Sequence, residues 1–585
     1  MKRLVIFFLL FLPIASGAQT SALKQQVLKQ IIQKPSGPNF AVVSAKLRAG
    51  KDVENAYKQL DTLLVRPYGD MFWMYGCAGL YLSTQDVLRP EYKARIRECW
   101  KHFTPYRGDT ENHFLMYYGS LMLMSEVWPD LGEQEWFTGQ TSKEIHNQAA
   151  DYLDHWIDEV ARYGQIEFDS PRYQYYFITP LVLLAEFAHD ARMKKRCQMM
   201  LEYFLVDHAL EYLNGNYCGA HSRVSDQAAI DPRSGEATAY GEYFFSDQVT
   251  HLEPDLAFAA LSSFVCPEII RTIANDRSKP FSNIKMKRGR TTIRDSKLRN
   301  ATIVKHDYMT KDYCLGSMEI SSELSDSVIG ALAQPIQQQT WSLVFAGEKK
   351  HNILFSLHPN FDARELAEFF PEEPSFMLER IGAVKAGYPN ENKWVGGSPY
   401  ERVFQNENEL LAYYDIPESA KYRHVDLYIP KAATILSRDQ TSAENDIFIL
   451  SAPGWIVLKY DSTLVGVRIM SPYDLTDEGD NYRIRTKTGN TACWIICVNQ
   501  SEMTADDFAK KLLHLEPVKR GSKVTFPSIT GKSIHFDLAQ LSNYKITETH
   551  LFASRFASAK LGSGILWLRA GKLHRALDFI HAKSW

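Results

Sequence analysis

An asparagine and a histidine stand side by side in a segment whose chemistry suits an acidic ligand. Asn112 and His113 follow Gly108-Asp109 and begin an apolar run. Asp109 is suited to cap a helix, which places both residues in its first turn. An asparagine amide donates hydrogen bonds to carboxylates, and a histidine can do the same or exchange a proton. The same spacing also fits a pair that only caps and packs.

A second candidate segment, 169–177, contains three tyrosines within four residues. Tyr173, Tyr175 and Tyr176 are too closely spaced for all of them to face one core, so we expect at least one to face a cleft. A tyrosine acts as an acid or base where a neighbouring cation stabilises its charged form. Arg172 is one such cation, and Arg172 and Tyr176 are also candidates for binding a ligand. The alternative interpretation is an aromatic core cluster.

A third candidate segment, 219–223, is polar and bounded by glycine, which predicts a loop. His221 and Arg223 in this loop can hold an anionic group, the arginine through a bidentate contact. Tyr240 follows in the stretch 239–243 and is a further candidate for ligand binding. The alternative is a solvated loop held by salt bridges.

Helical periodicity dominates the chain before residue 280 and predicts the elements that position these segments. Thr141 and Glu144 form a capping-box pattern ahead of apolar residues spaced mostly three and four apart. No fixed-period repeat is present, so we predict stacked helical hairpins rather than a regular solenoid. The predicted helices cover residues 22–34, 52–66, 69–83, 90–103, 111–128, 141–160, 174–190 and 192–212.

Strand-like runs with polar turns follow a polar, basic stretch at 276–290, which we predict to be a linker. They indicate a large antiparallel sandwich. The predicted organisation is α+β, with a helical domain at 19–280 and a β-sandwich domain at 281–585. The predicted strands are 340–346, 353–358, 424–429, 446–450 and a hairpin at 454–469 that turns at Asp461-Ser462.

Composition excludes several classes of protein. The 585 residues include 66 basic and 69 acidic side chains, for a net charge of −3, which argues against a dedicated nucleic-acid binder. The eight cysteines are scattered, so no disulfide framework is expected. Cys493 and Cys497 share a face of one predicted strand, roughly 13 Å apart, and are predicted to be buried thiols. The histidines lack metal-ligand spacing, so no metal site or cofactor is predicted.

The first eighteen residues have the pattern of a secretory signal peptide. Lys2 and Arg3 precede an apolar stretch at 4–13, and small residues at 16–18 fit a cleavage site. The alternative is an N-terminal anchor helix. The stretch is short for a bilayer span and no later apolar run reaches eighteen residues. We therefore predict a secreted or periplasmic protein without a membrane span.

A secreted helical domain followed by a β-sandwich resembles the polysaccharide lyases built from an (α/α) toroid and antiparallel sheets. These include the heparinase II/III-like, alginate and chondroitin lyases. In heparinase II/III-like and oligoalginate lyases an Asn-His pair precedes a catalytic tyrosine by an interval similar to that between Asn112-His113 and Tyr173. The segment 170–176 resembles a degenerate form of their Glu-Gly-Pro-x-Tyr loop. It lacks the Glu-Gly, so Tyr175 and Tyr176 are alternative counterparts.

The resemblance implies an incomplete N-terminal (α/α) toroid and a lyase that cleaves a uronic-acid-containing polysaccharide or oligosaccharide by β-elimination. Asn112, His113 and Arg223 would neutralise the uronate carboxylate. Tyr173 would act as acid and base, with His113 or His221 as its partner. Such a reaction needs no redox cofactor.

Two further functions remain open. A glycoside hydrolase on the same scaffold would need a pair of carboxyl groups at a defined separation. A non-catalytic glycan-binding protein would use aromatic residues without the Asn-His-Tyr set. The carboxylates available to a hydrolase are Glu111, Glu167, Asp169, Glu242 and Asp247.

Overall fold

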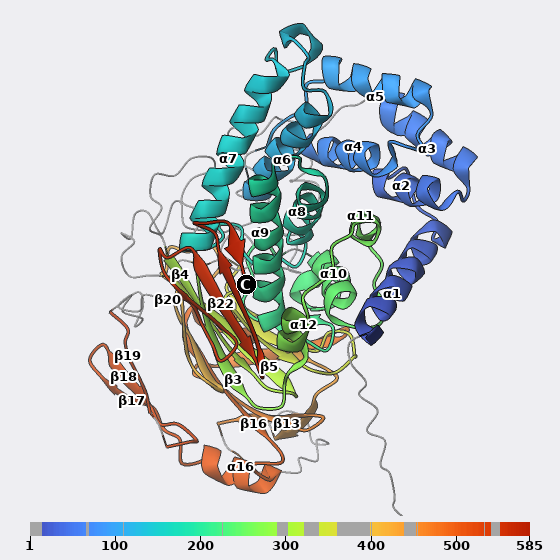
Figure 1. The fold of residues 1–585 in the computed structure, drawn as a ribbon. Coiled ribbons are helices and arrows are strands. Elements are labelled where there is room, and N and C mark those ends of the chain that lie inside the picture. Colours follow the sequence, from blue (N-terminus) through green and yellow to red (C-terminus); the bar gives the residue numbers. More distant parts are fainter. Residues whose placement is uncertain are drawn as a thin grey trace, which may run out of the picture.

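The protein is described by a computed structural model that combines an N-terminal helical part with antiparallel sheets (Figure 1). It confirms the predicted α+β fold of a toroid followed by a sandwich. None of the described helices is long and apolar enough to cross a membrane. The described residues are 14–65, 70–108, 110–224, 226–288, 302–320, 339–359, 398, 400–437, 452, 454–531, 533–539 and 550–585.

Five helices form the inner layer of the helical part, and each packs on the next around an incomplete toroid. The last of them also packs on the first. The middle three are buried around most of their circumference, as expected for helices surrounded by other helices. The inner helices are α2 (Phe40–Ala49), α4 (Met71–Thr84), α6 (Glu111–Val127), α8 (Tyr175–Phe187) and α11 (Leu256–Leu261).

The remaining helices pack around this inner layer. The longest bears the predicted capping box, in which Thr141 and Glu144 each accept a hydrogen bond from the other's backbone. These helices are α1 (Ile14–Gln33), α3 (Val53–Val65), α5 (Pro90–His102), α7 (Ser142–Tyr163), α9 (Ala191–Leu210), α10 (Glu236–Phe245) and α12 (Glu268–Asn275). All eight predicted helices are present, whereas α2, α10, α11 and α12 were not predicted.

The large sheet supports the toroid. Its described strands run in the order β14-β15-β10-β7-β6-β5-β4-β3-β20-β21-β22-β23-β24, all antiparallel. Strands from the end of the chain thereby join β3, the first strand after the helices. Their bounds are β3 (Phe281–Arg288), β4 (Thr302–Met309), β5 (Tyr313–Ile320), β6 (Trp341–Phe345), β7 (Ile353–Leu357), β10 (Asp426–Pro430), β14 (Tyr473–Glu478), β15 (Asn481–Thr486), β20 (His550–Ala553), β21 (Ala557–Lys560), β22 (Ile565–Ala570), β23 (Leu573–Asp578) and β24 (Lys583–Ser584).

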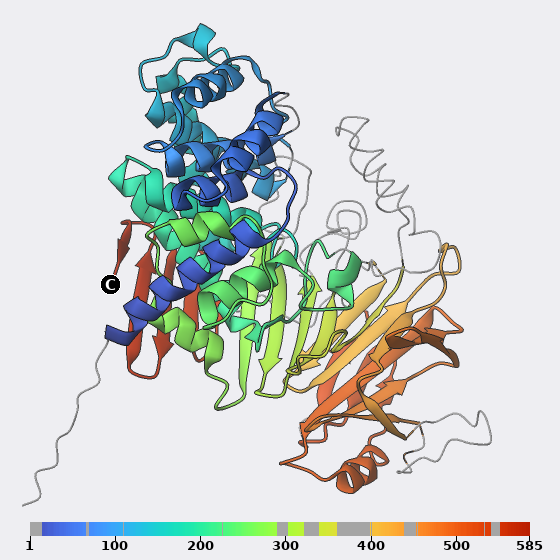
Figure 2. The same cartoon turned by 90° about the vertical axis from the view of Figure 1, so that its right-hand side faces the viewer.

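The middle of this sheet is buried on both faces. Cys314, Val344 and Phe355 belong to the core shared with the helices, while Leu315 and Leu343 belong to a second core. Alternate residues of a strand point to opposite faces, so these neighbours separate the two cores. Figure 2 shows the helices packed on one side of the large sheet.

A six-stranded antiparallel sheet completes the sandwich across the second core. Its other face packs on α16 (Ala505–Leu512) and a three-stranded sheet. The six-stranded sheet contains β8 (Glu401–Asn406), β9 (Glu409–Asp415), β11 (Thr434–Ser437), β12 (Ile456–Tyr460), β13 (Thr463–Ile469) and β16 (Asn490–Asn499), and the small sheet contains β17 (Val518–Arg520), β18 (Lys523–Phe526) and β19 (Ile534–Asp537). A two-stranded ribbon of β1 (Tyr212–Leu213) and β2 (Asn216–Tyr217) follows α9.

Most sequence-based strand predictions are confirmed. β12 and β13 form the predicted hairpin, and β6, β7 and β10 occupy three predicted strands. The predicted strand at 446–450 lies outside the described residues. Cys493 and Cys497 are buried free thiols on β16, as predicted.

The linker prediction for 276–290 is wrong for its central part, because Phe281–Arg288 is strand β3. The basic residues that suggested a solvated linker are Lys285, Lys287 and Arg288, and all three are buried. They point toward acidic residues of the helical part, so their charges are paired rather than hydrated.

Four buried histidines are expected to make the stability of the fold depend on pH. Burial lowers the pKa of His208 to about 3 and the pKa values of His221, His306 and His358 to about 4. Between about pH 6.5 and 4 the unfolded chain therefore binds protons that the folded chain does not. We expect the free energy of unfolding to fall by roughly 1 kcal/mol per pH unit for each histidine as the pH drops.

Denaturant titrations from pH 7.5 to 4.5 measure this slope. A His306→Gln variant should show a shallower dependence than the parent chain, because one titrating group is absent. An equal slope in both would contradict the assignment of His306 as a buried neutral group.

Candidate active site

The structure brings together the three segments that sequence chemistry singled out. Asn112 lies in the first turn of α6, Tyr173 lies in the loop before α8, and Arg223 lies in the loop after β2. Thr110 caps α6 through a hydrogen bond from the His113 backbone to its hydroxyl oxygen. Asp109, which we predicted as the cap, lies outside the described residues.

Glu167 joins these segments. Its Oε2 accepts hydrogen bonds from the Asn112 side-chain amide and, at 3.3 Å, from the Asn112 backbone. Its Oε1 lies 3.4 Å from Nε of Arg223. The Glu167 carboxylate is almost completely buried, so it stabilises both partners in a medium where charge-assisted contacts are strong. Sequence analysis had considered Glu167 only as a hydrolase carboxylate.

Arg223 provides the cation beside the candidate tyrosine. Its guanidinium carbon lies 4.8 Å from the centre of the Tyr173 ring, within cation–π distance. Arg172, one cation that we had considered for this place, instead lies 3.7 Å from a carboxylate oxygen of Glu236 on α10 and is half exposed. Tyr173 is partly exposed, so positive charge and a phenol meet where solvent can reach the ring.

Hydrogen bonds join the loop that contains Tyr173 to the loop that contains Arg223. Ser222 donates to the Phe168 carbonyl, and Ser170 donates to the Arg223 carbonyl at 3.2 Å. Asp169 and Arg223 both have left-handed backbone, at φ 46° and 52°. Such conformations are uncommon outside glycine and persist where surrounding contacts hold them. The loops therefore form one preorganised unit.

The structure contradicts an acid–base role for His221. Its Nδ1 lies 2.7 Å from the Asp169 carbonyl oxygen and its Nε2 lies 3.3 Å from that of Tyr217. The residue is 2% exposed, and burial lowers its pKa to about 4. His221 is thus enclosed between backbone carbonyls of the two loops, and in the neutral form that burial favours it can donate to only one of them.

The predicted ligand-binding tyrosines divide between surface and core. Tyr176 is partly exposed, and its ring contacts Phe72 at 4.6 Å between centroids. Tyr240 is fully buried on α10 rather than in a loop, and its hydroxyl lies 2.6 Å from that of Thr179. The prediction of Tyr240 as a ligand contact is therefore wrong, because helix packing encloses it.

His113 lies on the same aromatic surface. Its ring meets that of Phe72 edge-to-face at 5.5 Å between centroids. Gly108 packs directly against it in the left-handed region, at φ 79°. A Cβ atom at position 108 would overlap the imidazole and lie 2.6 Å from the His113 Cβ. Glycine at this position thus allows the histidine to sit where it does.

We expect Gly108→Ala to displace His113. The substitution should lower the free energy of unfolding by about 1–3 kcal/mol through backbone strain. If His113 takes part in catalysis, as we propose below, turnover should also fall at least about tenfold, because small misplacements of a catalytic group are costly. Gly132→Ala is the matched control, since Gly132 has φ −80° and nothing within 4 Å of its Cβ position. Equal behaviour of the two variants would contradict the role assigned to Gly108.

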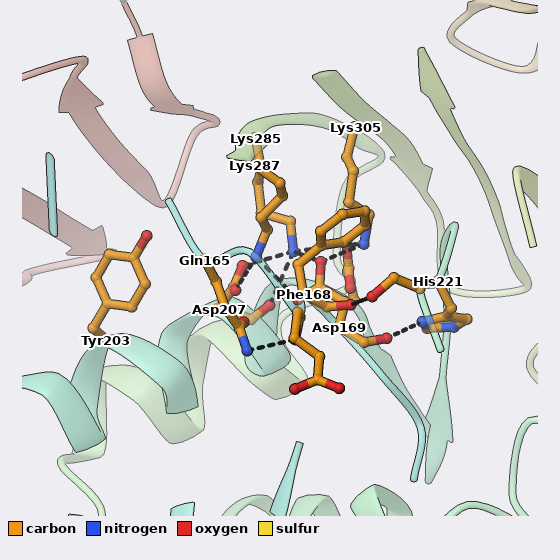
Figure 3. A network of polar contacts seen from close by, with 12 residues as sticks. Gln165, Phe168, Asp169, Tyr203, Asp207, His221, Lys285, Lys287 and Lys305 are labelled. Atoms are coloured by element: carbon orange, nitrogen blue, oxygen red, sulfur yellow. Dashed lines mark hydrogen bonds and ion pairs between the residues drawn. The ribbon is translucent and has the colours of Figure 1, made fainter. Parts of the chain in front are cut away.

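A buried ionic network lies beneath the loop (Figure 3). Lys287 and Lys305 contact Asp169 at 3.0 and 2.5 Å, and Lys285 contacts Asp207 and Glu211 at 2.7 Å each. All of these side chains are 0–1% exposed. The lysines come from β3 and β4 and the acids from the helical part, so the network fixes the site loop to the sheet.

Opposite charges in this network stabilise each other against the cost of burial. Burial opposes ionisation of Asp169, yet the three lysines hold its pKa well below its ordinary value. The carboxylates correspondingly raise the pKa of Lys285 against the effect of burial. Lys285 and Lys287 are two residues apart, so they share one face of a strand, and this spacing was the sequence signal for the network. A basic stretch alone does not reveal its acidic partners.

The other carboxylates considered for a hydrolase also have structural partners. Glu111 accepts hydrogen bonds from Trp156 and from the backbone of Ile166. Glu242 accepts four hydrogen bonds from 250–251, and Asp247 pairs with Arg271. Within the described residues, no group of three His, Cys, Asp or Glu side chains could hold a metal ion.

Comparison with known proteins yields only distant likenesses, all to solved structures. No protein-family model and no curated protein matches the chain. The X-ray structure of the chondroitin AC lyase of Streptomyces coelicolor A3 in complex with chondroitin sulphate is similar, with a TM-score of 0.38. The sequences are 10% identical over 96% of this chain and 89% of that chain.

Proposed function

We propose that the protein is a secreted polysaccharide lyase that cleaves a uronic-acid-containing polysaccharide by β-elimination. The observation that carries this proposal is the stacking of Arg223 on a partly exposed Tyr173, held by Glu167 and Asn112. This arrangement places a fixed cation, Arg223, beside a group that can act as acid and base, Tyr173, on preorganised loops. Those are the two requirements for removing a weakly acidic proton next to a carboxylate.

The proton at C5 of a uronic acid lies alpha to the carboxylate. Arg223 and His113 would bind this carboxylate and stabilise the enolate-like intermediate. Tyr173 would take the C5 proton and return a proton to O4 as the C4–O4 bond breaks. A C4=C5 double bond forms, and the departing sugar keeps the bridging oxygen as the hydroxyl of its new reducing end. The reaction uses neither an oxidant nor a reductant.

Asn112 and Glu167 have an indirect role in this proposal. The buried Asn112 amide already donates to Glu167, and Glu167 holds Arg223. Asn112 therefore acts as a positioning residue rather than as a direct ligand of the substrate carboxylate. His221 fastens the loop and takes no part in proton transfer.

Ultraviolet absorbance of the unsaturated product tests the proposal. The purified chain is mixed with alginate, glucuronan, heparin and chondroitin sulfate in separate reactions. Rising absorbance with any polymer supports β-elimination and identifies the substrate. New reducing ends without absorbance would overturn it in favour of a hydrolase, and binding without either signal would favour a non-catalytic glycan-binding protein.

A further inference from the structure

Two tryptophans are exposed on the sheet far along the sequence from the candidate active site. Trp567 on β22 and Trp585 after β24 are 50% and 57% exposed. Their ring centroids lie 5.8 Å apart with the planes at 82°. Contiguous exposed apolar surface, especially where polar residues surround it, commonly marks a binding site.

Strand register places cations beside these rings. On β22, Leu566 and Leu568 are buried, whereas Trp567 and Arg569 are exposed on the opposite face. Cross-strand pairing sets Arg569 opposite His574 on β23 and Trp567 opposite Ser558 on β21. We call the exposed face formed by Ser558, Trp567, Arg569, His574 and Trp585 the aromatic–basic face.

A groove of about 430 Å³ runs along the aromatic–basic face. Two further arginines line it, but each is paired, Arg575 with Glu202 and Arg555 with Asp276. Arg569 forms no ion pair with any residue in the described part of the chain. Lys560 and Lys572 are exposed on the neighbouring strand end and turn. The acidic side chains near the groove are thus already engaged, and its remaining charge is positive.

We propose that the aromatic–basic face is an accessory binding site for an acidic polysaccharide. Tryptophan rings offer flat apolar surfaces on which sugar rings can stack. Arg569 can pair with a uronate carboxylate, and the lysines can attract further acidic units along the polymer. This proposal depends on the proposed function only for the class of ligand. The face itself performs no chemistry and would hold the polymer close to the candidate active site.

Binding of the full chain to sodium alginate and to chondroitin sulfate tests this site by titration calorimetry. The double variant Trp567→Ala, Trp585→Ala should weaken polymer binding about tenfold. Arg569→Ala should also weaken it and should reduce its dependence on NaCl. Arg520→Ala is the matched control, because Arg520 is an exposed arginine on β17, away from this face.

Three outcomes would overturn the proposal. One is polymer affinity that the variants leave unchanged, or no binding of either polymer by the parent chain. The second is tighter binding of duplex DNA or neutral dextran than of the acidic polymers. The third is light scattering that shows a dimer of the parent chain which the tryptophan variant dissociates. Cleavage by the parent chain is measured separately from binding. If the parent chain binds the polymers without cleaving them and the variants bind them more weakly, the lyase proposal fails and the aromatic–basic face is still supported.

Discussion

Tyr173→Phe should lower turnover by a factor of roughly 10² to 10⁴ while leaving substrate binding nearly unchanged, since general acid–base catalysis contributes about this much. The substitution removes only the phenol oxygen. Arg223 can still lie over a phenylalanine ring, and no side-chain hydrogen bond of the described structure is lost, because Tyr173 donates only through its backbone, to Ser170. The measurement is initial rate by ultraviolet absorbance, with affinity from calorimetry.

Tyr176→Phe is the matched control for this variant. Tyr176 lies three residues away, is also partly exposed, and packs 6.2 Å from Tyr173 between ring centroids. Burial is the main cause that raises its pKa above the ordinary range, which makes it a poor proton acceptor. We expect this variant to keep most of its activity. If Tyr176→Phe lost turnover and Tyr173→Phe did not, the acid–base role would belong to Tyr176.

The elements of the fold were predictable where local patterning was strong. The spacing of apolar residues and the capping box predict an amphipathic helix such as α7. Apolar runs separated by turn residues predict a hairpin such as β12–β13. The short helices α10 and α11 were missed because fewer than three turns give little periodicity. The pairing of β20 with β3 joins residues more than 260 apart, and no local signal encodes it.

The candidate site was predictable as residue types but not as contacts. Asn112, Tyr173 and Arg223 were identified from their chemistry, and the structure brings them together. Which cation would lie over Tyr173 depended on the register of two loops, so Arg172 was considered for that place and Arg223 only for binding an anionic group. Burial also decided against His221 and Tyr240, because a polar or aromatic residue type does not reveal whether packing encloses it.

Lys305→Met should lower the free energy of unfolding by about 3–5 kcal/mol, the usual cost of breaking a buried ion pair. Lys305 contacts Asp169 at 2.5 Å and Glu211 at 2.6 Å, and all three side chains are fully buried. The variant leaves an excess of buried negative charge that water cannot solvate. Lys431→Met, which removes an exposed partner of Asp477, is the control and should cost about 1 kcal/mol or less.

The double variant Asp169→Asn, Lys305→Met separates charge balance from packing. Each single variant leaves one unbalanced charge, whereas the double variant removes one charge of each sign. We therefore expect the double variant to lose clearly less than the sum of the two singles in denaturant unfolding. Strict additivity would contradict direct coupling between Asp169 and Lys305. Asp169 lies in the same loop as Glu167 and Tyr173. Each single variant should therefore also lose turnover at temperatures where it remains folded. Such a loss would link the buried lysines of the sheet to the geometry of the candidate active site.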